Sequence, residues 1–366
     1  MIKLAASGII LAGLLFGGSA QAEIMIGLAG PTTGENAFLG EQMKHGAQQA
    51  ITDINAQGGI NGEKLALHFA DDACDPKQAV AVANQMASAG VKFVIGHGCS
   101  GASVPASKVY AEENILMITP SATNPALTEG GLKNVFRVCG RDDQQGSAVG
   151  QYLLSHYAGK KIAILHNQSA WGAGIAQEVK RTINDAGVKE AIFEPFSPGE
   201  RDYSALISHL KQAGVDAAFV GGFYTEVGLI VRQMEAQGAG FQVLGGDALV
   251  SKSFWAITGP AAEGVVMSFN PDPRKRPEAK TALESLRKSG FEPEGYTLYT
   301  YAAVQVIAEG IKRAGAPDSV KAAAAIRQSP VPTVAGILPY DAKGDVKGSN
   351  YVMYRWHNSN YDEIGE

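Results

Sequence analysis

The chain has 366 residues, of which 45% are apolar and 18% charged, and its formal net charge is -5. This length exceeds what one hydrophobic core usually organises, so the composition favours two packed lobes over a disordered chain. The modest negative charge, without a long run of Lys and Arg, argues against a nucleic-acid partner.

The first 22 residues have the three parts of a secretory signal peptide. Lys3 gives a positive start, residues 4–16 form an apolar stretch, and Ala20-Gln21-Ala22 is a small-x-small cleavage site. The apolar run is shorter than the about 20 residues that a membrane anchor needs, and no Cys stands at the cleavage point for lipid attachment. We therefore predict an exported protein, cleaved after Ala22.

Apolar runs then alternate with helical patterns in a first series of elements. A helix is predicted to begin after Asp75, because Asp is a good N-cap and Pro76 suits the first helical turn. The other expected elements of this series are strands at residues 24–30, 65–72, 91–96 and 115–120 and a helix at residues 41–56. Such alternation predicts a parallel sheet with helices on both faces.

A second series of the same kind begins after Arg141. Its expected strands lie at residues 161–167, 191–196, 216–222, 242–247 and 263–269, and its expected helices include residues 174–186 and 203–213. The proline-flanked segment 271–277 reads as a solvated linker. It leads to helices at 278–288, 299–314 and 318–328, which have few further strands to cover and are expected to return to the first lobe.

An α/β fold with two lobes follows from these two series. The first lobe is predicted to comprise residues 23–141 and 271–346, and the second residues 142–270 and 347–366. A chain that crosses more than once between two lobes forms a hinge at the crossings.

One glycine motif lies between a predicted strand and a helical pattern: residues 96–101 spell G-x-G-x-x-G. A dinucleotide site should place this motif after the first strand and an acidic residue at the end of the next one. Here the motif follows the third strand of the exported chain, and the next strand ends in Thr119-Pro120. An NAD-dependent oxidoreductase therefore stays only as an alternative of another class.

The same turn suits a small anion. A helix N-terminus presents unpaired N–H groups and a partial positive charge, and Ser100 adds a hydroxyl at that point. Ser121 and Thr123 follow the neighbouring strand and would bring two more hydroxyls to the same edge of the sheet. Three hydroxyls without a fixed cation fit a small carboxylate better than a phosphate; the alternative is that they only cap helices and turns.

Catalytic and metal-binding patterns are not found. The chain has no G-x-S-x-G elbow, and its seven histidines form no H-x-x-x-H pair, so no metal or other cofactor is expected. His97 is interpreted as a hydrogen-bonded structural residue, and the adjacent Asp71 and Asp72 as solvated carboxylates. Cys74 and Cys99 can pair in an oxidising compartment, and Cys139 is expected to be a buried, small apolar residue.

Several longer stretches resemble the leucine/isoleucine/valine-binding proteins of Gram-negative bacteria. They are DINAQGGINGEKL, DDACDPKQAVAVAN, VKFVIGHGCS, ILMITPSAT and DAKGDVKG, and the resemblance covers essentially the whole mature chain. It implies a type I periplasmic binding protein fold, two Rossmann-like lobes joined by three crossovers, a Cys74–Cys99 disulfide and no catalysis. It further implies a monomer in the periplasm that binds an amino acid and delivers it to an inner-membrane ABC permease.

The resemblance also implies a set of binding residues. Ser100, Ser121 and Thr123 match positions that hold the ligand's α-carboxylate and help with its ammonium, and Asp247 matches a Glu that pairs with the ammonium. Further matched or adjacent positions of the implied site are Leu39, Ala122, Trp171, Phe223 and Tyr296.

The departures from the family pattern concern the size of the pocket. Gly98 replaces a larger apolar residue, Gly101 a Ser, Leu39 and Trp171 each a Tyr, and Asp247 a Glu. The sequence therefore indicates an amino-acid site more firmly than a particular side chain: Leu, Ile and Val come first, and another small neutral amino acid is the alternative.

Overall fold

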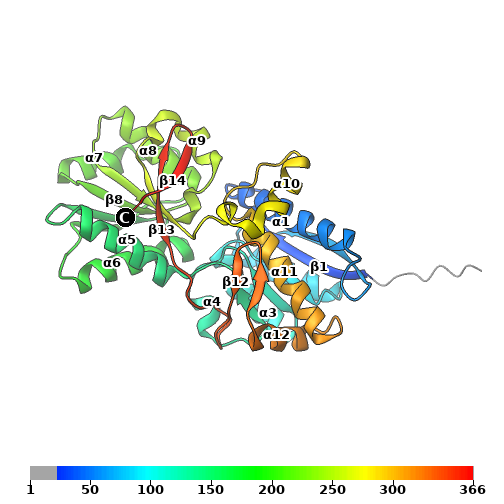
Figure 1. Ribbon diagram of the computed structural model, residues 1–366. Helices are drawn as coiled ribbons and strands as arrows, with labels where there is room; N and C mark the ends of the chain where they lie inside the picture. Colours follow the sequence, from blue (N-terminus) through cyan, green and yellow to red (C-terminus); the bar gives the residue numbers. More distant parts are fainter. Residues whose placement is uncertain (1–22, 366) are drawn as a thin grey trace, which may run out of the picture.

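Two parallel sheets, one in each half of the molecule, organise the computed structural model, which describes residues 23–365 (Figure 1). The predicted signal peptide therefore lies outside the described residues. The first sheet has the order β2-β1-β3-β4-β5, and all its strands are parallel. Its strands are β1 (Glu23–Gly30), β2 (Lys64–Asp71), β3 (Phe93–Gly96), β4 (Leu116–Thr119) and β5 (Val135–Arg137).

Helices cover both faces of the first sheet. On β3, Phe93 and Ile95 face the core under α1 and α11, whereas Val94 between them faces the core under α2 and α3. This alternation explains the continuous apolar runs in the sequence, since a parallel sheet is buried on both faces. The helices of this half are α1 (Ala37–Ala56), α2 (Pro76–Ser88), α3 (Ser100–Glu112), α4 (Ala126–Glu129), α10 (Lys280–Lys288), α11 (Thr297–Ala314) and α12 (Ser319–Gln328).

The second sheet has the order β14-β13-β10-β9-β8-β6-β7, with β13 and β14 antiparallel at one edge. Its strands are β6 (Ile162–His166), β7 (Ile192–Pro195), β8 (Ala217–Gly221), β9 (Gln242–Gly245), β10 (Val266–Phe269), β13 (Val352–His357) and β14 (Asn360–Glu363). Its helices are α5 (Asp142–His156), α6 (Ala170–Asp185), α7 (Ser204–Ala213), α8 (Tyr224–Ala236) and α9 (Lys252–Thr258). A hairpin of β11 (Val331–Thr333) and β12 (Gly336–Leu338) completes the fold.

The chain passes between the two sheets at three places. It leaves the first sheet after β5, returns after β10 with α10 and α11, which pack on α1, and leaves again after β12 to place β13 beside β10. Figure 1 shows α11 and α12 beside β1 in one half, and β13 and β14 in the other. We propose the predicted residue ranges as the two lobes, because this packing assigns each helix to one sheet.

Three sequence-based expectations about this fold are wrong. The late part of the chain contains four more strands, β11 to β14, where few were expected. Segment 271–277 is not uniformly solvated: Pro273 is buried, and Arg274 is half-buried between Asp272 and the Tyr361 ring. Asp72 is fully buried rather than solvated, since its carboxylate accepts a hydrogen bond at 2.6 Å from His97 Nδ1.

Helix α1 begins at Ala37, one turn earlier than expected. Gly40 permits this early start, because a Cβ at this position would lie 1.6 Å from the Pro31 carbonyl oxygen. The preceding loop therefore lies directly on the first turn of α1. As a result, Phe38 and Leu39 are helical and point to the gap between the sheets, where the pocket described below is found.

Candidate functional site

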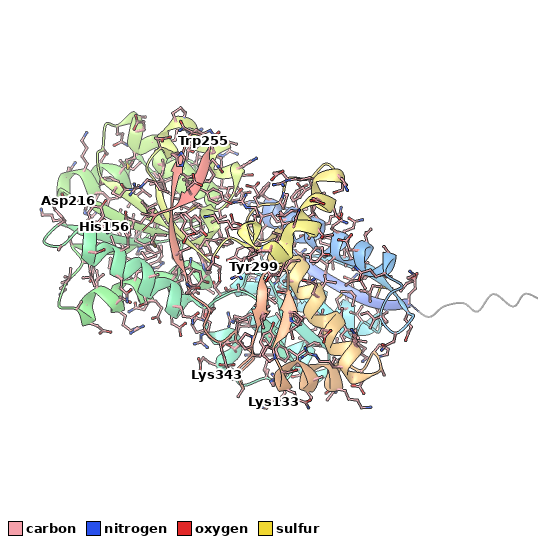
Figure 2. The ribbon with its side chains drawn as sticks, in the orientation of Figure 1. Lys133, His156, Asp216, Trp255, Tyr299 and Lys343 are labelled. Atoms are coloured by element: carbon pink, nitrogen blue, oxygen red, sulfur yellow. A yellow bond between two sulfur atoms is a disulfide. The ribbon has the colours of Figure 1, made fainter. Side chains whose placement is uncertain are left out.

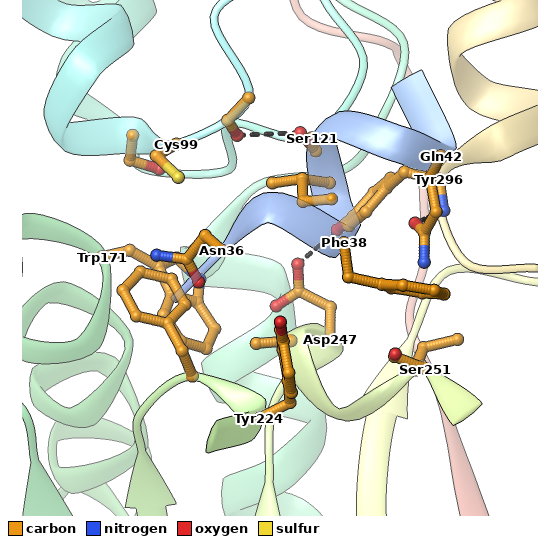
Figure 3. Close-up of a pocket in the computed structure, with 16 residues that line it drawn as sticks. Asn36, Phe38, Gln42, Cys99, Ser121, Trp171, Tyr224, Asp247, Ser251 and Tyr296 are labelled. Atoms are coloured by element: carbon orange, nitrogen blue, oxygen red, sulfur yellow. Dashed lines mark hydrogen bonds between the residues drawn. The ribbon is translucent and has the colours of Figure 1, made fainter. Parts of the chain in front are cut away.

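A pocket lies between the two lobes, at the carboxyl ends of strands from both sheets (Figure 3). Its lining residues from the first lobe are Asn36, Phe38, Leu39, Gln42, Gly98, Cys99, Ser100, Ser121 and Tyr296, and those from the second are Trp171, Phe223, Tyr224, Asp247, Ala248, Val250 and Ser251.

The first lobe contributes hydroxyl groups to the pocket. Ser121 donates to the Gly98 carbonyl at 2.8 Å, and Ser100 accepts from the Asn124 amide at 3.2 Å. The Ser100 hydroxyl therefore keeps its own proton for another acceptor. Ser100 is also the first residue of α3, so the helix places its positive end at the same wall. The remaining proton of Ser100 and the start of α3 make this wall suitable for a carboxylate.

The turn before α3 is fixed by one covalent and several polar contacts. Cys99 forms a disulfide with Cys74, with a Cα–Cα distance of 5.4 Å, as the resemblance implied. Behind it, the buried His97 ring contacts Asp72 through Nδ1 and the Tyr110 hydroxyl at 3.0 Å through Nε2. This arrangement confirms that His97 is a hydrogen-bonded structural residue. The turn is therefore held in place from both sides.

Ala122 and Thr123 belong to the predicted site but do not line the pocket. Both are fully buried, and the Thr123 hydroxyl has no hydrogen-bond partner among residues 23–365. The loop that carries them is held by Arg137, which is also fully buried and donates to the carbonyls of Ala122 at 2.6 Å and Asn124 at 3.2 Å. Thr123 thus lies directly behind the wall that Ser121 forms.

Aromatic rings form most of the opposite wall. Trp171 and Phe223 stack with their ring centroids 5.4 Å apart, and Phe38 meets Tyr224 edge-on at 6.5 Å. The Trp171 ring lies close to the backbone of Gly246, where an added Cβ would be 2.9 Å from it. Of the three aromatic residues expected on this side, Trp171 and Phe223 lie here, whereas Tyr296 approaches from the first lobe. Phe38 was not predicted as a site residue, because the helix was expected to begin after it. Tyr224 was not predicted either, and the only indication for it in the sequence is that it follows Phe223.

One carboxylate of the pocket is held in a fixed orientation. Asp247 is buried, and it accepts hydrogen bonds from Gln145 Nε2 at 2.9 Å and from the Tyr296 hydroxyl, which approaches from the other lobe (Figure 3). Burial raises the pKa of Asp247, although these two hydrogen bonds act in the opposite direction. The Gln145 contribution was missed, because nothing in the sequence relates Gln145 to a residue 102 positions later.

Further hydrogen bonds join the lobes around the pocket. Asn124 Nδ2 donates to the Ala170 carbonyl at 2.8 Å, and the Lys252 amide donates to Glu294 at 2.9 Å. Together with the Tyr296–Asp247 contact, they hold the lobes in a closed arrangement. Figure 2 shows Tyr299, one turn after Tyr296, where the lobes meet, and Trp255 near the top of the second lobe.

Metal sites and membrane-spanning helices are not found in residues 23–365. No group of three or more His, Cys, Asp or Glu side chains there is arranged to hold a metal ion. None of the helices in this range combines the length and apolar character that a membrane span requires. Cys139 is buried as expected. The described residues thus offer a pocket with a polar wall, an aromatic wall and a buried acid as the candidate site.

Two lobes around such a pocket define a class of ligand-binding proteins, and the comparison with known proteins identifies it. The chain belongs to the periplasmic binding protein family, whose model matches residues 23–360. Its type I fold and its resemblance to the Leu/Ile/Val-binding proteins are thereby confirmed.

Particular relatives narrow this class. Leu/Ile/Val-binding protein homolog 1 of Brucella suis is 50% identical over 358 residues, covering 97% of this chain and 96% of the relative. An amino acid binding protein of Pseudomonas aeruginosa is 46% identical, covering 92% and 91%. Among solved structures, the leucine binding protein LivK of Thermotoga maritima has a TM-score of 0.86 at 26% identity, covering 93% of this chain and 98% of that one.

The structure of LivJ from Streptococcus pneumoniae was solved with isoleucine. It also has a TM-score of 0.86 at 26% identity, and the comparison covers 94% of this chain and 99% of that one. These relatives place the chain in the family of branched-chain amino acid ABC transporter substrate-binding proteins.

Proposed function

We propose that this protein is the periplasmic substrate-binding component of an ABC importer and that it binds Leu, Ile or Val between its lobes. The observation that carries the proposal is the pocket, which faces the hydroxyls of Ser100 and Ser121 and the start of α3 on one side and the buried Asp247 on the other. A zwitterion is costly to desolvate unless each charged end meets a partner. This site supplies both partners.

Each of the two walls would bind a different part of the amino acid. The first lobe would hold the α-carboxylate at Ser100, Ser121 and the turn before α3. The second lobe would bring Asp247 to the ammonium, where a carboxylate forms a charge-assisted hydrogen bond. Trp171, Phe223, Tyr224, Phe38 and Leu39 would enclose an apolar side chain.

Binding would shift the protein towards the closed arrangement. A ligand that contacts both lobes makes all its contacts only when the lobes are together, so it favours that state. A micromolar Kd corresponds to about 8 kcal/mol. The closed surface would then be what the inner-membrane permease recognises, and no chemical step is needed.

Two other functions are considered beside the binding of Leu, Ile or Val. The glycine at position 98 lets Leu39 and Met43 approach, since an added Cβ would lie 2.8 Å from Met43 Sδ and 3.1 Å from Leu39 Cδ2. The pocket is therefore shaped differently from the family pattern, which favours another small neutral amino acid as second candidate. An oxidoreductase is the remaining one, and addition of protein to NADH without any change in fluorescence would end it.

Intrinsic fluorescence tests the proposal. The twenty amino acids are titrated one at a time, with Trp171 as the reporter and Trp171→Phe to show which part of the signal comes from the pocket. Trp255 and Trp356 lie together elsewhere, 6.0 Å apart, and give a constant background. We expect saturable binding of Leu, Ile or Val. Binding of none of the twenty would refute the proposal.

Asp247→Ala tests the ammonium partner. We expect Kd to rise about tenfold to a hundredfold, because a hydrogen bond to a charged group contributes about 1.5–3 kcal/mol. Asp185→Ala is the matched control, since it removes the same charge from the second lobe at a side chain that is 68% exposed. Wild-type affinity in Asp247→Ala would show that the assignment of Asp247 is wrong.

A further inference from the structure

A second buried carboxylate lies one helical turn before Gln145, the residue that donates to Asp247, and the proposed function does not use it. Asp142 is the first residue of α5 and is fully buried. Neither of its carboxylate oxygens has a hydrogen-bond partner among the residues that the structure describes. A buried polar group without a partner is costly, and a buried charge much more so. Asp142 therefore needs a proton or a cation.

The surroundings of Asp142 connect it to the pocket. Gln145, one turn later on α5, donates to Asp247 Oδ1 and leaves its own Oε1 without a partner. On the facing helix α6, Trp171 Nε1 is also without a partner, and Gly174 approaches Asp142, since an added Cβ there would lie 3.9 Å from Oδ2. Buried polar atoms without partners thus gather behind the Trp171 side of the pocket.

No cation nearby neutralises this pair of acids. Arg137 is the nearest buried guanidinium, but its donors go to Asp345, Thr128 and the carbonyls of Ala122 and Asn124. Arg141 is engaged by Asp345, Asp143 and Glu129. Two buried carboxylates therefore share one region with no positive side chain assigned to either.

The groups around Asp142 act on its proton in opposite directions. Burial is the main reason that its pKa lies well above the ordinary value, and the charges of Asp247 and Asp143 raise it further. The Thr123 hydroxyl, which lies short of hydrogen-bond geometry, and the Arg137 charge lower it, and the start of α5 also favours the ionised form. The remaining neighbours that titrate are Cys139 and Tyr351, both buried and neutral near pH 7.

We propose that Asp142 and Asp247 act as one acidic unit, which holds a proton in the ligand-free protein and releases it to solvent when the ammonium of an amino acid binds. The ammonium then donates to Asp247, which lines the pocket, and its positive charge takes the place of the lost proton. The inference rests on the proposed amino-acid site. Because the ammonium replaces the lost proton, the ligand must carry a protonated amine. Carboxylic acids without an amine should therefore be poor ligands.

Calorimetry in two buffers of different ionisation enthalpy tests this proton release, because the difference in apparent heat counts the protons exchanged. For the wild-type protein we expect release of up to one proton per bound amino acid. In the pH range where this proton is released, Kd should fall by up to about tenfold for each unit by which the pH rises. Asp142→Asn should release none and lose the pH dependence. Asp185→Asn, which removes a carboxylate whose side chain is 68% exposed, should behave as wild type.

Infrared spectroscopy supplies an independent measurement. The ligand-free protein near neutral pH should show the C=O band of a protonated carboxyl group, and this band should disappear when the amino acid is added and be absent from Asp142→Asn. Wild-type protein that binds an amino acid without exchanging a proton at any pH from about 5 to 8 would overturn the inference. That result needs no variant, so it holds even if Asp142→Asn fails to fold. Failure to bind any amino acid would instead overturn the proposed function.

Discussion

Asp345 and Asp142 are two buried carboxylates with opposite surroundings. Asp345 accepts from Arg137 Nε at 2.6 Å, from Arg141 at 2.7 Å and from the Thr128 hydroxyl at 2.9 Å. Asp142, next to Arg141 in the chain, accepts from none of the described residues. Burial raises the pKa of Asp345, but the charges and hydrogen bonds of the two arginines outweigh it and lower the pKa. Both arginines thus donate to Asp345, and neither donates to Asp142.

We infer from this difference that Asp345 has a structural role and Asp142 a functional one. A fully paired carboxylate stabilises one arrangement of the chain, here the joining of β5, the loop after β4 and the segment around Asp345. An unpaired one is costly, so it stays in a fold only where a ligand or a proton supplies the missing partner. The following variants test that distinction.

Asp345→Asn should have the largest effect on the free energy of unfolding. Breaking a buried ion pair by removing one partner costs about 3–5 kcal/mol, because the other charge stays buried. Denaturant unfolding measures the loss. Asp185→Asn removes a surface partner of Arg181 and should change the value by less than about 1 kcal/mol. Equal effects of the two variants would refute the structural role of Asp345.

Tyr296→Phe should weaken ligand binding by about threefold to thirtyfold. The Tyr296 hydroxyl donates to Asp247 across the lobes, so its loss disfavours the closed form as well as the orientation of the acid. Fluorescence titration measures Kd, and solution X-ray scattering measures the opening. Tyr299→Phe is the control, since Tyr299 donates to the Pro271 carbonyl and does not line the pocket. Unchanged affinity and shape in Tyr296→Phe would contradict this prediction.

The smallest expected effect is on how the free energy of unfolding changes with pH. Asp142 and Asp345 should change it in opposite directions. The pKa of Asp142 is raised on folding, so its contribution is present below the ordinary carboxyl value and is lost as pH rises through the raised pKa. The pKa of Asp345 is lowered, so its contribution is present above the ordinary value and is lost as pH falls through the lowered pKa. Asp142→Asn should therefore keep more of its stability on the alkaline side.

Thermal unfolding of the ligand-free protein across this pH range, followed by circular dichroism, checks both signs. We expect the melting temperature of Asp142→Asn to shift by a few degrees relative to wild type. Asp185→Asn serves as the control, since its side chain is 68% exposed. If Asp142→Asn lost stability on the alkaline side as steeply as wild type does, its carboxyl group would not be the one that titrates there.

Much of the fold could be predicted because it depends on local patterns. Asp75 with Pro76 fixed the start of α2, and the apolar runs indicated most strands of both sheets. The start of α1 could not be predicted, because it depends on the contact of Gly40 with Pro31. Strands β13 and β14 were missed because they gain their partner β10 only after the chain crosses back between the lobes.

The site was predictable to the extent that its residues follow strands or match family motifs. Ser100, Ser121 and Asp247 stand directly after β3, β4 and β9, where open α/β sheets bind ligands. The burial of Thr123 behind the wall could not be predicted, nor could the Gln145–Asp247 hydrogen bond. The hydrogen bond depends on how α5 lies against the second sheet, and the burial of Thr123 depends on the loop that Arg137 holds. No local pattern in the sequence describes either.

The bond between Cys74 and Cys99 has a consequence for the life of the chain before export. Thiols stay reduced in the cytosol and are oxidised outside it. A newly made chain would thus hold the turn before α3 by non-covalent contacts alone, and the carboxylate wall would gain its covalent anchor only after translocation. The receptor would become fully organised in the same compartment as its substrate.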